Sequence, residues 1–354
     1  MRQRRAREPK PAGPVVTRRP TMADIAREAG VSKGAVSYAL NGRTGVSAST
    51  RRRIVRIAGE LGWRPYGITR GGRVTRADAV GLVLARPARF LALEPFMMAL
   101  VSGVEAELGR RKVALRLQVV RDHREEISTY RRWWTGAHVD GVLVLDLAAP
   151  DERVTELARC GLPALVLGGP DGLGPLPGLW SDDTTTMHTV VDHLVTLGHR
   201  RIARIAGPAR LRHTATRTAA MTHALQRHRL PPGVVINTDY GGDEGAAAAR
   251  RLLDRRPRPT AIICDSDVLA VVALGVATRS GLAVPGGLSL VAWDDSALCE
   301  LARPALTAVS RDVAAYGAHA ARLLLQHVGG QPVATRPESL PRLVVRHSTA
   351  RPDP

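Results

Sequence analysis

The sequence is short of aromatic side chains and of cysteine. Aromatic residues make up only 3% of the 354 positions, so its hydrophobic cores must be built from Ala, Val, Leu and Ile. The three cysteines, Cys160, Cys264 and Cys299, are widely spaced, which excludes a disulfide framework and a cysteine-based zinc motif. An odd number of cysteines in a chain of this size favours a reducing cytoplasm, with each thiol serving as a small core residue.

Long apolar stretches and enzyme motifs are also missing. No run of 18 or more apolar residues occurs, so no membrane-spanning helix is expected. Residues 1–20 are basic and proline-containing without the apolar segment of a secretory signal, and we expect a disordered basic tail. The sequence has no G-x-S-x-G elbow, Walker loop, H-E-x-x-H motif or G-x-G-x-x-G after a strand. An enzyme on a doubly wound fold is therefore a disfavoured alternative, and no cofactor or metal is predicted.

Positive charge is abundant and unevenly placed. The formal net charge is +19. Residues 1–73 hold 17 Lys and Arg against 4 Asp and Glu, and the rest of the chain holds 34 against 28. About a fifth of the length thus carries two-thirds of the net charge, which favours a polyanion partner for the N-terminal part. A solvated basic surface is the alternative.

Three short helices are predicted between residues 21 and 65. Thr21 can cap the first helix, and Gly30 ends it. Ser32 can cap the second helix, which stops at Asn41-Gly42, and Ser47 can cap the third. A helix, a glycine turn and a second helix with small residues at the crossing are typical of a helix-turn-helix.

The second predicted helix suits a DNA groove. The first residues of such a helix face base edges in the major groove, where Lys33 can donate to guanine O6 and N7. Ser32, Ser37 and Asn41 suit phosphate contacts. A small three-helix module that holds a protein partner is the alternative.

From Ala79 onward, apolar runs alternate with helical stretches, which indicates parallel sheets buried on both faces. The series is too long for one sheet, so we expect two lobes, with the chain crossing near Trp180–Asp183 and returning near Ser310. The predicted strands are 79–85, 113–120, 139–147, 162–168, 201–207, 260–265 and 288–293. The predicted helices include 97–110, 185–198, 214–229, 244–256, 267–280 and 312–327.

The stretch "TMADIAREAGVSKGAVSYALNGRTGVSASTRRRIVRIAGELGWRP" resembles the headpiece of the LacI/GalR family of bacterial transcription regulators. Later stretches, among them "AVGLVLARP", "CDSDVLAVVAL" and "PALTAVSRD", are similar to that family's core motifs, in order, to about Val345. The resemblance implies an N-terminal all-α helix-turn-helix headpiece plus an α/β two-lobed periplasmic-binding-protein-like domain with parallel sheets. Together with the composition of the two ends, it predicts a basic tail at 1–20, the DNA-binding domain at 21–65, a hinge at 66–77, the two-lobed effector-binding and dimerisation domain at 78–349 and a frayed end at 350–354.

The resemblance also implies roles for individual headpiece residues. Lys33, Gly34 and Tyr38 lie where the family's recognition helix discriminates operators, and Gly34 has no side chain with which to read a base. The positions that match backbone contacts are Thr21, Ser32, Ser37 and Asn41.

The hinge departs from the family pattern. Tyr66 stands where the family usually has Asn, and Gly72 falls at the position of a Leu that wedges into the minor groove. Two adjacent glycines cost a short helix about 2 kcal/mol relative to Ala, whereas Arg70 and Arg73 can still enter a narrow minor groove. We expect weaker operator bending and looser coupling to the headpiece. The alternative is that the hinge folds on DNA regardless.

Polar residues at strand ends predict an effector cleft between the lobes. The candidates are Asp182, Arg217, Ser266, Asp294 and Arg311. Carboxylates and guanidinium groups beside an indole ring, from Trp180 or Trp293, suit a polyhydroxylated ligand. By resemblance, Arg217, Ser266 and Asp294 match ligand-contacting positions, although the family commonly has Asn where Ser266 stands. The alternative for each residue is a strand-end cap or a salt bridge between the lobes.

The sequence therefore predicts a cytoplasmic, sequence-specific DNA-binding regulator. We expect a repressor that binds a palindromic operator as a homodimer and responds to a small, sugar-like effector. A DNA-binding regulator without an effector response and a transport-type sugar-binding protein are the alternatives.

Overall fold

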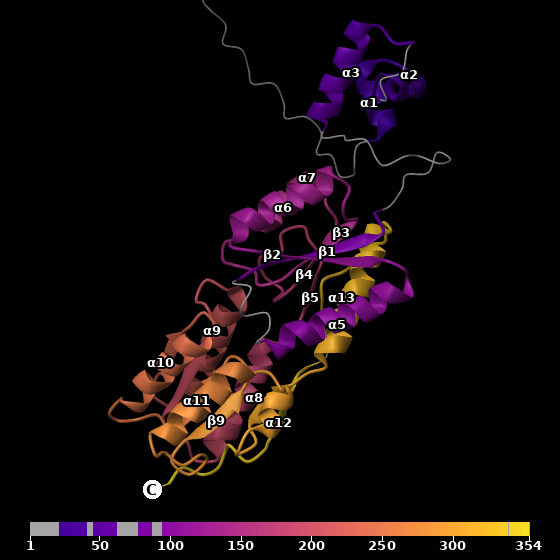
Figure 1. The fold of residues 1–354 in the computed structure, drawn as a ribbon. Helices are drawn as coiled ribbons and strands as arrows, with labels where there is room; N and C mark the ends of the chain where they lie inside the picture. Colours follow the sequence, from indigo (N-terminus) through magenta and orange to yellow (C-terminus); the bar gives the residue numbers. More distant parts are fainter. Residues whose placement is uncertain (1–20, 41–44, 62–76, 87–93, 339, 354) are drawn as a thin grey trace, which may run out of the picture.

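The computed structural model describes residues 21–40, 45–61, 77–86, 94–338 and 340–353. They form a small helical headpiece and two α/β lobes (Figure 1). The predicted tail at 1–20, Asn41, Arg73 and all but Ala77 of the predicted hinge at 66–77 lie outside the described residues.

The headpiece consists of α1 (Met22–Ala29), α2 (Lys33–Leu40) and α3 (Ala48–Glu60). Thr21 and Asp24 form a capping box at the start of α1, in which Thr21 Oγ1 accepts from the Asp24 N–H at 3.3 Å. Gly30 has a left-handed backbone (φ 63°) and ends α1, so that the Val31 N–H can return to the Ala26 carbonyl at 2.9 Å. The predicted start and end of this helix are therefore confirmed.

The three helices share one small core made of aliphatic side chains and alanines. Ile25, Val36 and Ile54 are fully buried in it. Alanines at the crossings let helices of 8 to 13 residues approach closely, and each helix contacts the other two. Small residues at the helix crossings, together with a few larger aliphatic side chains in the core, thus make so short a unit compact.

Lobe 1 is built on a six-stranded parallel sheet with the order β11-β5-β4-β3-β1-β2. Apolar side chains on α5 and α13 cover one face of it, and those on α6 and α7 cover the other. Its strands are β1 (Ala79–Ala85), β2 (Ala114–Val120), β3 (Gly141–Val144), β4 (Ala164–Leu167), β5 (Gly178–Trp180) and β11 (Arg336–Pro337). Its helices are α5 (Pro95–Arg110), α6 (His123–Thr135), α7 (Glu152–Cys160) and α13 (Val313–Val328).

Helices α5 and α13 cross with almost no space between their backbones. A Cβ atom built on Gly103 would lie 1.9 Å from the Ala314 carbonyl oxygen, and one built on Gly317 would lie 2.4 Å from the Leu100 carbonyl oxygen. Only glycine fits at both positions, so this contact fixes the distance between the two helices.

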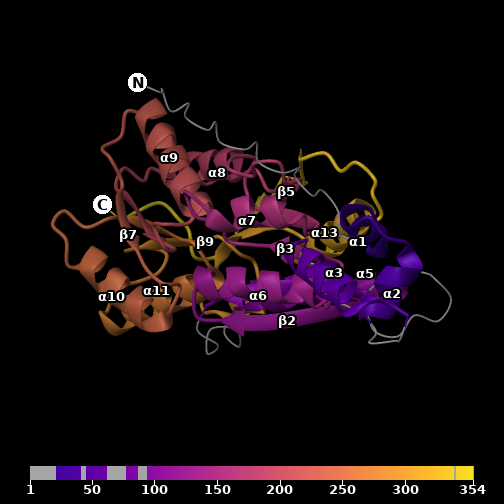
Figure 2. The ribbon, with the colours of Figure 1, turned by 90° about the horizontal axis from the view of Figure 1, so that it is seen from above.

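Lobe 2 repeats the plan with the sheet order β12-β10-β9-β8-β6-β7. Figure 2 shows its sheet between α8 and α9 on one side and α10 and α11 on the other. Its strands are β6 (Ile202–Ala206), β7 (Val234–Asn237), β8 (Ala261–Cys264), β9 (Ser289–Ala292), β10 (Thr307–Ser310) and β12 (Arg342–Val344). Its helices are α8 (Asp183–Thr196), α9 (Arg212–Arg227), α10 (Gly242–Leu253), α11 (Asp267–Arg279) and the short α12 (Ala297–Leu301).

The predicted fold class is confirmed, with three differences in detail. Strand β12 pairs antiparallel with β10, unlike the parallel pairs around it. The chain crosses between β5 and α8 and between β10 and α13, as predicted, but it crosses a third time because β11 joins the sheet of lobe 1 and β12 that of lobe 2.

The third difference concerns the predicted frayed end at 350–354. Within it, Ala350 is tied to lobe 2, since its N–H donates to Ser289 Oγ at 3.1 Å. The Asp353 N–H donates to the Gly286 carbonyl at 3.2 Å. Fraying is therefore the wrong prediction for Ala350 and Asp353, because their backbone N–H groups are hydrogen-bonded to lobe 2. Across the described ranges, every helix is too short or too polar to span a lipid bilayer.

Candidate functional site

A cavity of about 430 Å³ lies between the two lobes, a size typical of a small-molecule site. Its wall is formed by loops at the carboxyl ends of strands from both sheets, together with the first residues of α8, α9 and α11. All five residues predicted for the effector cleft line it, namely Asp182, Arg217, Ser266, Asp294 and Arg311.

Two of these five residues are helix caps. Asp182 Oδ1 accepts from the Thr185 N–H at 2.9 Å at the start of α8, and Ser266 Oγ accepts from the Leu269 N–H at 3.2 Å at the start of α11. The capping alternative therefore describes both side chains. Both nevertheless border the cavity, so capping and ligand contact are compatible.

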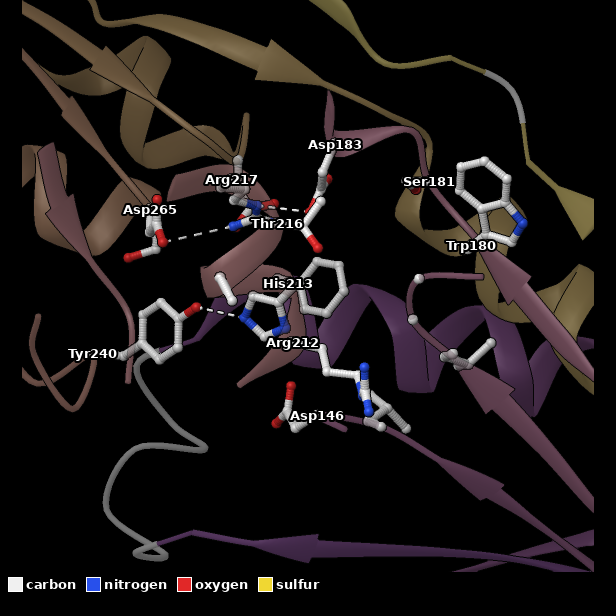
Figure 3. A pocket seen from close by; sticks show the side chains of 18 of the residues that line it. Asp146, Trp180, Ser181, Asp183, Arg212, His213, Thr216, Arg217, Tyr240 and Asp265 are labelled. Atoms are coloured by element: carbon white, nitrogen blue, oxygen red, sulfur yellow. Dashed lines mark hydrogen bonds and ion pairs between the residues drawn. The ribbon is translucent and has the colours of Figure 1, made fainter. Parts of the chain in front are cut away.

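Arg217 projects from α9 into the cavity and is buried (Figure 3). Its Nε donates to Asp183 Oδ2 at 2.8 Å, its Nη1 lies 4.0 Å from Asp265 Oδ2, and its guanidinium stacks 4.4 Å from the centre of the Trp293 ring. Burial lowers the pKa of Arg217, but the charges of Asp183 and Asp265 outweigh it and raise that pKa overall. The guanidinium is thus held charged and in one orientation.

Arg311 lies where β10 leads into α13 and contacts both sides of the crossing. Its Nη2 donates to Asp294 Oδ1 at 2.9 Å, and its Nη1 donates to Ser181 Oγ at 3.4 Å. The guanidinium sits 4.9 Å from the centre of the Phe96 ring. The neighbouring Asp295 points elsewhere and binds Arg346 at 2.7 Å, as expected for adjacent side chains.

Sequence reasoning missed a second charged group on the lobe 1 side. Arg86, directly after β1, pairs with both Glu94 and Asp146. Burial acts to raise the pKa of Asp146, but the charge of Arg86 outweighs it and lowers that pKa overall. Burial likewise acts to lower the pKa of Arg86, but the charges of Asp146 and Glu94 outweigh it and raise that pKa overall. Asp146 is the last but one residue of the predicted strand 139–147, so a search for polar residues near strand ends would have found it.

His213 and Tyr240 form the floor of the cavity in lobe 2 (Figure 3). His213 Nε2 and the Tyr240 hydroxyl are 2.8 Å apart, and burial lowers the pKa of His213 and raises that of Tyr240. The Tyr240 ring reaches this place because Gly207 has no side chain: a Cβ there would lie 2.1 Å from Tyr240 Cζ. Tyr240 (φ 71°) and Asp146 (φ 54°) both have left-handed backbones, a strain that often marks binding sites.

The lobes are also joined directly across the cleft. Ala148 of lobe 1 and Leu211 of lobe 2 form an antiparallel β-bridge, which we call the interlobe bridge. In it the Arg212 N–H donates to the Leu147 carbonyl at 2.8 Å, and the Ala149 N–H donates to the Arg210 carbonyl at 3.2 Å. The Arg212 Nε adds a bond to the Ala148 carbonyl at 3.0 Å. Ala149 and Arg212 line the cavity, so the bridge forms part of its wall.

The headpiece presents the predicted recognition helix α2 with an open face. Lys33, Gly34 and Tyr38 are exposed, and the Tyr38 ring rests against Gly45, where a Cβ would lie 3.3 Å from Tyr38 Cδ2. Ser32 is exposed and caps α2, with its Oγ accepting from the Ala35 N–H at 3.1 Å. Ser37 is half-buried.

Among the predicted backbone-contacting residues, Thr21 has its side chain held by Asp24. Its hydroxyl donates to Asp24 Oδ2 at 2.7 Å within the capping box. The structure thus brings Ser32, Lys33, Gly34 and Tyr38 to one surface and places Thr21 at the start of α1.

A three-helix unit with an exposed helix-turn-helix face, followed by two lobes around a polar cavity, defines a DNA-binding regulator with a ligand-binding core. Comparison with known protein families supports this class of protein. Residues 21–66 match the bacterial regulatory proteins of the lacI family, and residues 191–349 match the periplasmic binding protein-like domain.

Whole-chain relatives cover almost all of the sequence. The HTH-type transcriptional regulator CelR of Thermobifida fusca is 34% identical over 340 residues, covering 94% of this chain and 98% of its own. A solved transcriptional regulator CelR–cellobiose complex is 33% identical with a TM-score of 0.71, covering 93% of this chain and 100% of its own. The lac repressor dimer bound to operator and the anti-inducer ONPF is 25% identical with a TM-score of 0.69, covering 94% and 100%. The chain belongs to the lacI family of bacterial regulatory proteins.

Proposed function

We propose that this protein is a homodimeric transcriptional repressor of the cytoplasm and nucleoid, which binds a palindromic operator. A sugar-like effector lowers or raises its affinity for that operator. The observation that carries the proposal is the presence, on one chain, of an exposed helix-turn-helix face and a polar interlobe cavity lined by all five predicted cleft residues. The relatives support it, since one is a dimer bound to operator and another a complex with cellobiose.

Exposed apolar side chains on both lobes support dimerisation. Met98 on α5 is 56% exposed and Leu117 on the edge strand β2 is 44% exposed. In lobe 2, Leu298 and Leu301 on α12 are exposed as well. A second copy of the chain would remove these side chains from water and set two recognition helices about one turn of DNA apart, as a palindrome requires.

The proposed response to effector runs through the cleft. A ligand that bridges Asp183, Arg217 and Arg311 would stabilise one arrangement of the lobes over another, because these residues come from lobe 2 and from two of the interlobe crossings. Coupling energies between such sites are typically about 1–3 kcal/mol, or about 5- to 150-fold in operator affinity.

The experiment that tests the DNA function is selection of sheared genomic DNA by the purified full-length protein at physiological salt, followed by sequencing. A short palindrome upstream of a few genes is the expected result. Enrichment without any motif would mean that the headpiece binds charge alone.

Two headpiece variants separate base reading from phosphate binding. Lys33→Ala should relax the selected motif at one position in each half-site, since a direct base contact is worth about 1–3 kcal/mol of discrimination. Arg52→Ala, which removes an exposed cation from α3, should weaken binding to every sequence alike and make it less dependent on salt. An unchanged motif for Lys33→Ala would show that the recognition helix has been assigned wrongly.

A further inference from the structure

Resting on the proposed function, we infer that the effector is an uncharged polyol with neighbouring hydroxyl groups, and that phosphorylated or carboxylated sugars are rejected. The ground is the charge balance of the interlobe cavity. Among the lining residues that the structure describes, eight side chains are carboxylates and four are arginines. The carboxylates are Glu94, Asp146, Asp171, Asp182, Asp183, Asp265, Asp267 and Asp294, and the arginines are Arg86, Arg212, Arg217 and Arg311.

The arginines are already engaged within the protein. Arg86 pairs with Glu94 and Asp146. The other ion pairs are Arg217–Asp183 and Arg311–Asp294, and Arg212 donates to the Ala148 carbonyl in the interlobe bridge. An anionic ligand that formed a two-bond ion pair with Arg86, Arg217 or Arg311 would have to displace the carboxylate already bound there, which would leave that carboxylate buried without its counter-charge. Such an exchange is costly where the displaced carboxylate is shielded from water.

Three buried polar atoms in the cavity wall lack hydrogen-bond partners in the described part of the chain, and they favour a ligand that both donates and accepts. Asp183 Oδ1 and Asp267 Oδ2 have no donor, although both side chains are almost fully buried, and Arg311 Nε has no acceptor. The Arg217 Nη1, 4.0 Å from Asp265, lies beyond hydrogen-bond distance of it and can still donate to a ligand oxygen. A hydroxyl group can donate to Asp183 and accept from Arg217 at once, whereas a phosphate or carboxylate only accepts.

The remaining carboxylates oppose an anion further. Asp267, at the start of α11, is 2% exposed, and burial, with the nearby charge of Asp294, raises its pKa. Arg204 lies behind the cavity wall, and its Nε donates to Asp265 Oδ1 at 2.6 Å. The charge of Arg204 outweighs burial and lowers the pKa of Asp265, which keeps that carboxylate charged. The raised pKa of Asp267 means that its surroundings already disfavour a negative charge, so an anionic ligand placed beside it would be disfavoured for the same reasons.

The experiment compares matched sugars on the full-length protein by thermal melting and calorimetry. The probes are glucose, cellobiose and maltose, each beside its aldonic acid and its 6-phosphate. The expected result is that the neutral member of at least one set raises the melting temperature, while its acid and phosphate bind at least about tenfold more weakly, the cost of displacing one charged hydrogen bond.

Stabilisation by an acid or phosphate in preference to its neutral partner would overturn the inference and leave the proposed function standing. If no probe stabilised the protein or altered its DNA binding, both the effector response and the inference would be withdrawn.

Replacing single carboxylates by amides tests whether the charge of the cavity causes the preference for neutral sugars. Asp294→Asn removes one carboxylate beside the ligand and releases Arg311, so the preference for the neutral sugar should narrow by about tenfold. Asp183→Asn should weaken the neutral sugar itself, because a hydroxyl loses its charged acceptor. Asp254→Asn, an exposed carboxylate at the end of α10, is the matched control and should change neither value. If Asp294→Asn left the preference unchanged while the variant melted like the parent protein, the cavity charge would not be its source.

Discussion

Gly34 stands second in the recognition helix α2, where nothing in the described chain requires a missing side chain. A Cβ built there would meet only Ser32 Oγ, at 3.8 Å, and the backbone has no positive φ. Gly34→Ala should therefore stabilise the helix by about 0.5–1 kcal/mol. Slower hydrogen exchange of the α2 amides in the full-length protein would measure this gain.

The same substitution should weaken operator binding if α2 lies in the groove. An added methyl group on the exposed face would keep the helix from approaching the DNA, so we expect about tenfold lower operator affinity, the equivalent of about 1.4 kcal/mol. Binding to random DNA, which depends on charge, is the internal control and should stay the same. A stabler helix with undiminished operator affinity would place Gly34 away from the DNA.

At the scale of single residues, the sequence predicted which residues line the cavity better than it predicted their contacts with one another. Arg217, Asp294 and Arg311 could be found because each lies just beyond a strand end or early in a helix that follows one. Their partners could not all be found in this way. His213 meets Tyr240 only through the packing of α9 against the loop after β7, and no spacing along the chain records that distance.

Helices α5 and α13 approach each other closely enough that their contact depends on glycine. Gly103→Ala would push a methyl group into the Ala314 carbonyl, 1.9 Å away, so the helices would have to separate. We expect a loss of about 2–3 kcal/mol of unfolding free energy, as for other overpacked cores. Denaturant unfolding measures it.

Gly109→Ala, on the same helix α5, is the matched control because a Cβ atom built on Gly109 would have no atom within 4 Å. It should be neutral or stabilise by up to about 1 kcal/mol. Equal stability of the two variants would show that α5 and α13 can move apart without cost.

Elements with a strong apolar run were predicted most closely. The run at 79–85 matches β1 residue for residue, because a strand buried on both faces has no polar positions to blur its ends. Helices α6 and α7 were missing from the prediction because charged residues fill their exposed faces. The strands missing from it are β5, β7, β10, β11 and β12, which are two to four residues long and, unlike the four-residue strands β3, β4, β8 and β9, do not lie within a predicted apolar run.

At the scale of the whole molecule, the two lobes are connected by three chain crossings and by the interlobe bridge. The crossing between β5 and α8, the crossing between β10 and α13 and the interlobe bridge all line the same cavity. The space available to an effector therefore depends on how the lobes are held together, and the bridge can be altered without touching the crossings. It could not be predicted from the sequence, since residues 147–149 and 210–212 carry no complementary signal.

Arg212→Pro would remove two of the three hydrogen bonds described for the interlobe bridge, with little harm to either lobe. Arg212 is the first residue of α9, a position that tolerates proline, and Leu211 before it has the extended backbone (φ −83°, ψ 135°) that precedes proline. The variant loses the N–H bond to Leu147 and the Nε bond to Ala148, together worth about 1–3 kcal/mol. The lobes should then open more often, so small-angle scattering of the ligand-free protein should give a larger radius of gyration, and effector affinity should fall about 5- to 100-fold. Arg212→Ala keeps the backbone bond and should show a smaller change in both measurements. Unchanged scattering for Arg212→Pro would mean that the chain crossings and the remaining bond from the Ala149 N–H to the Arg210 carbonyl hold the lobes together without Arg212.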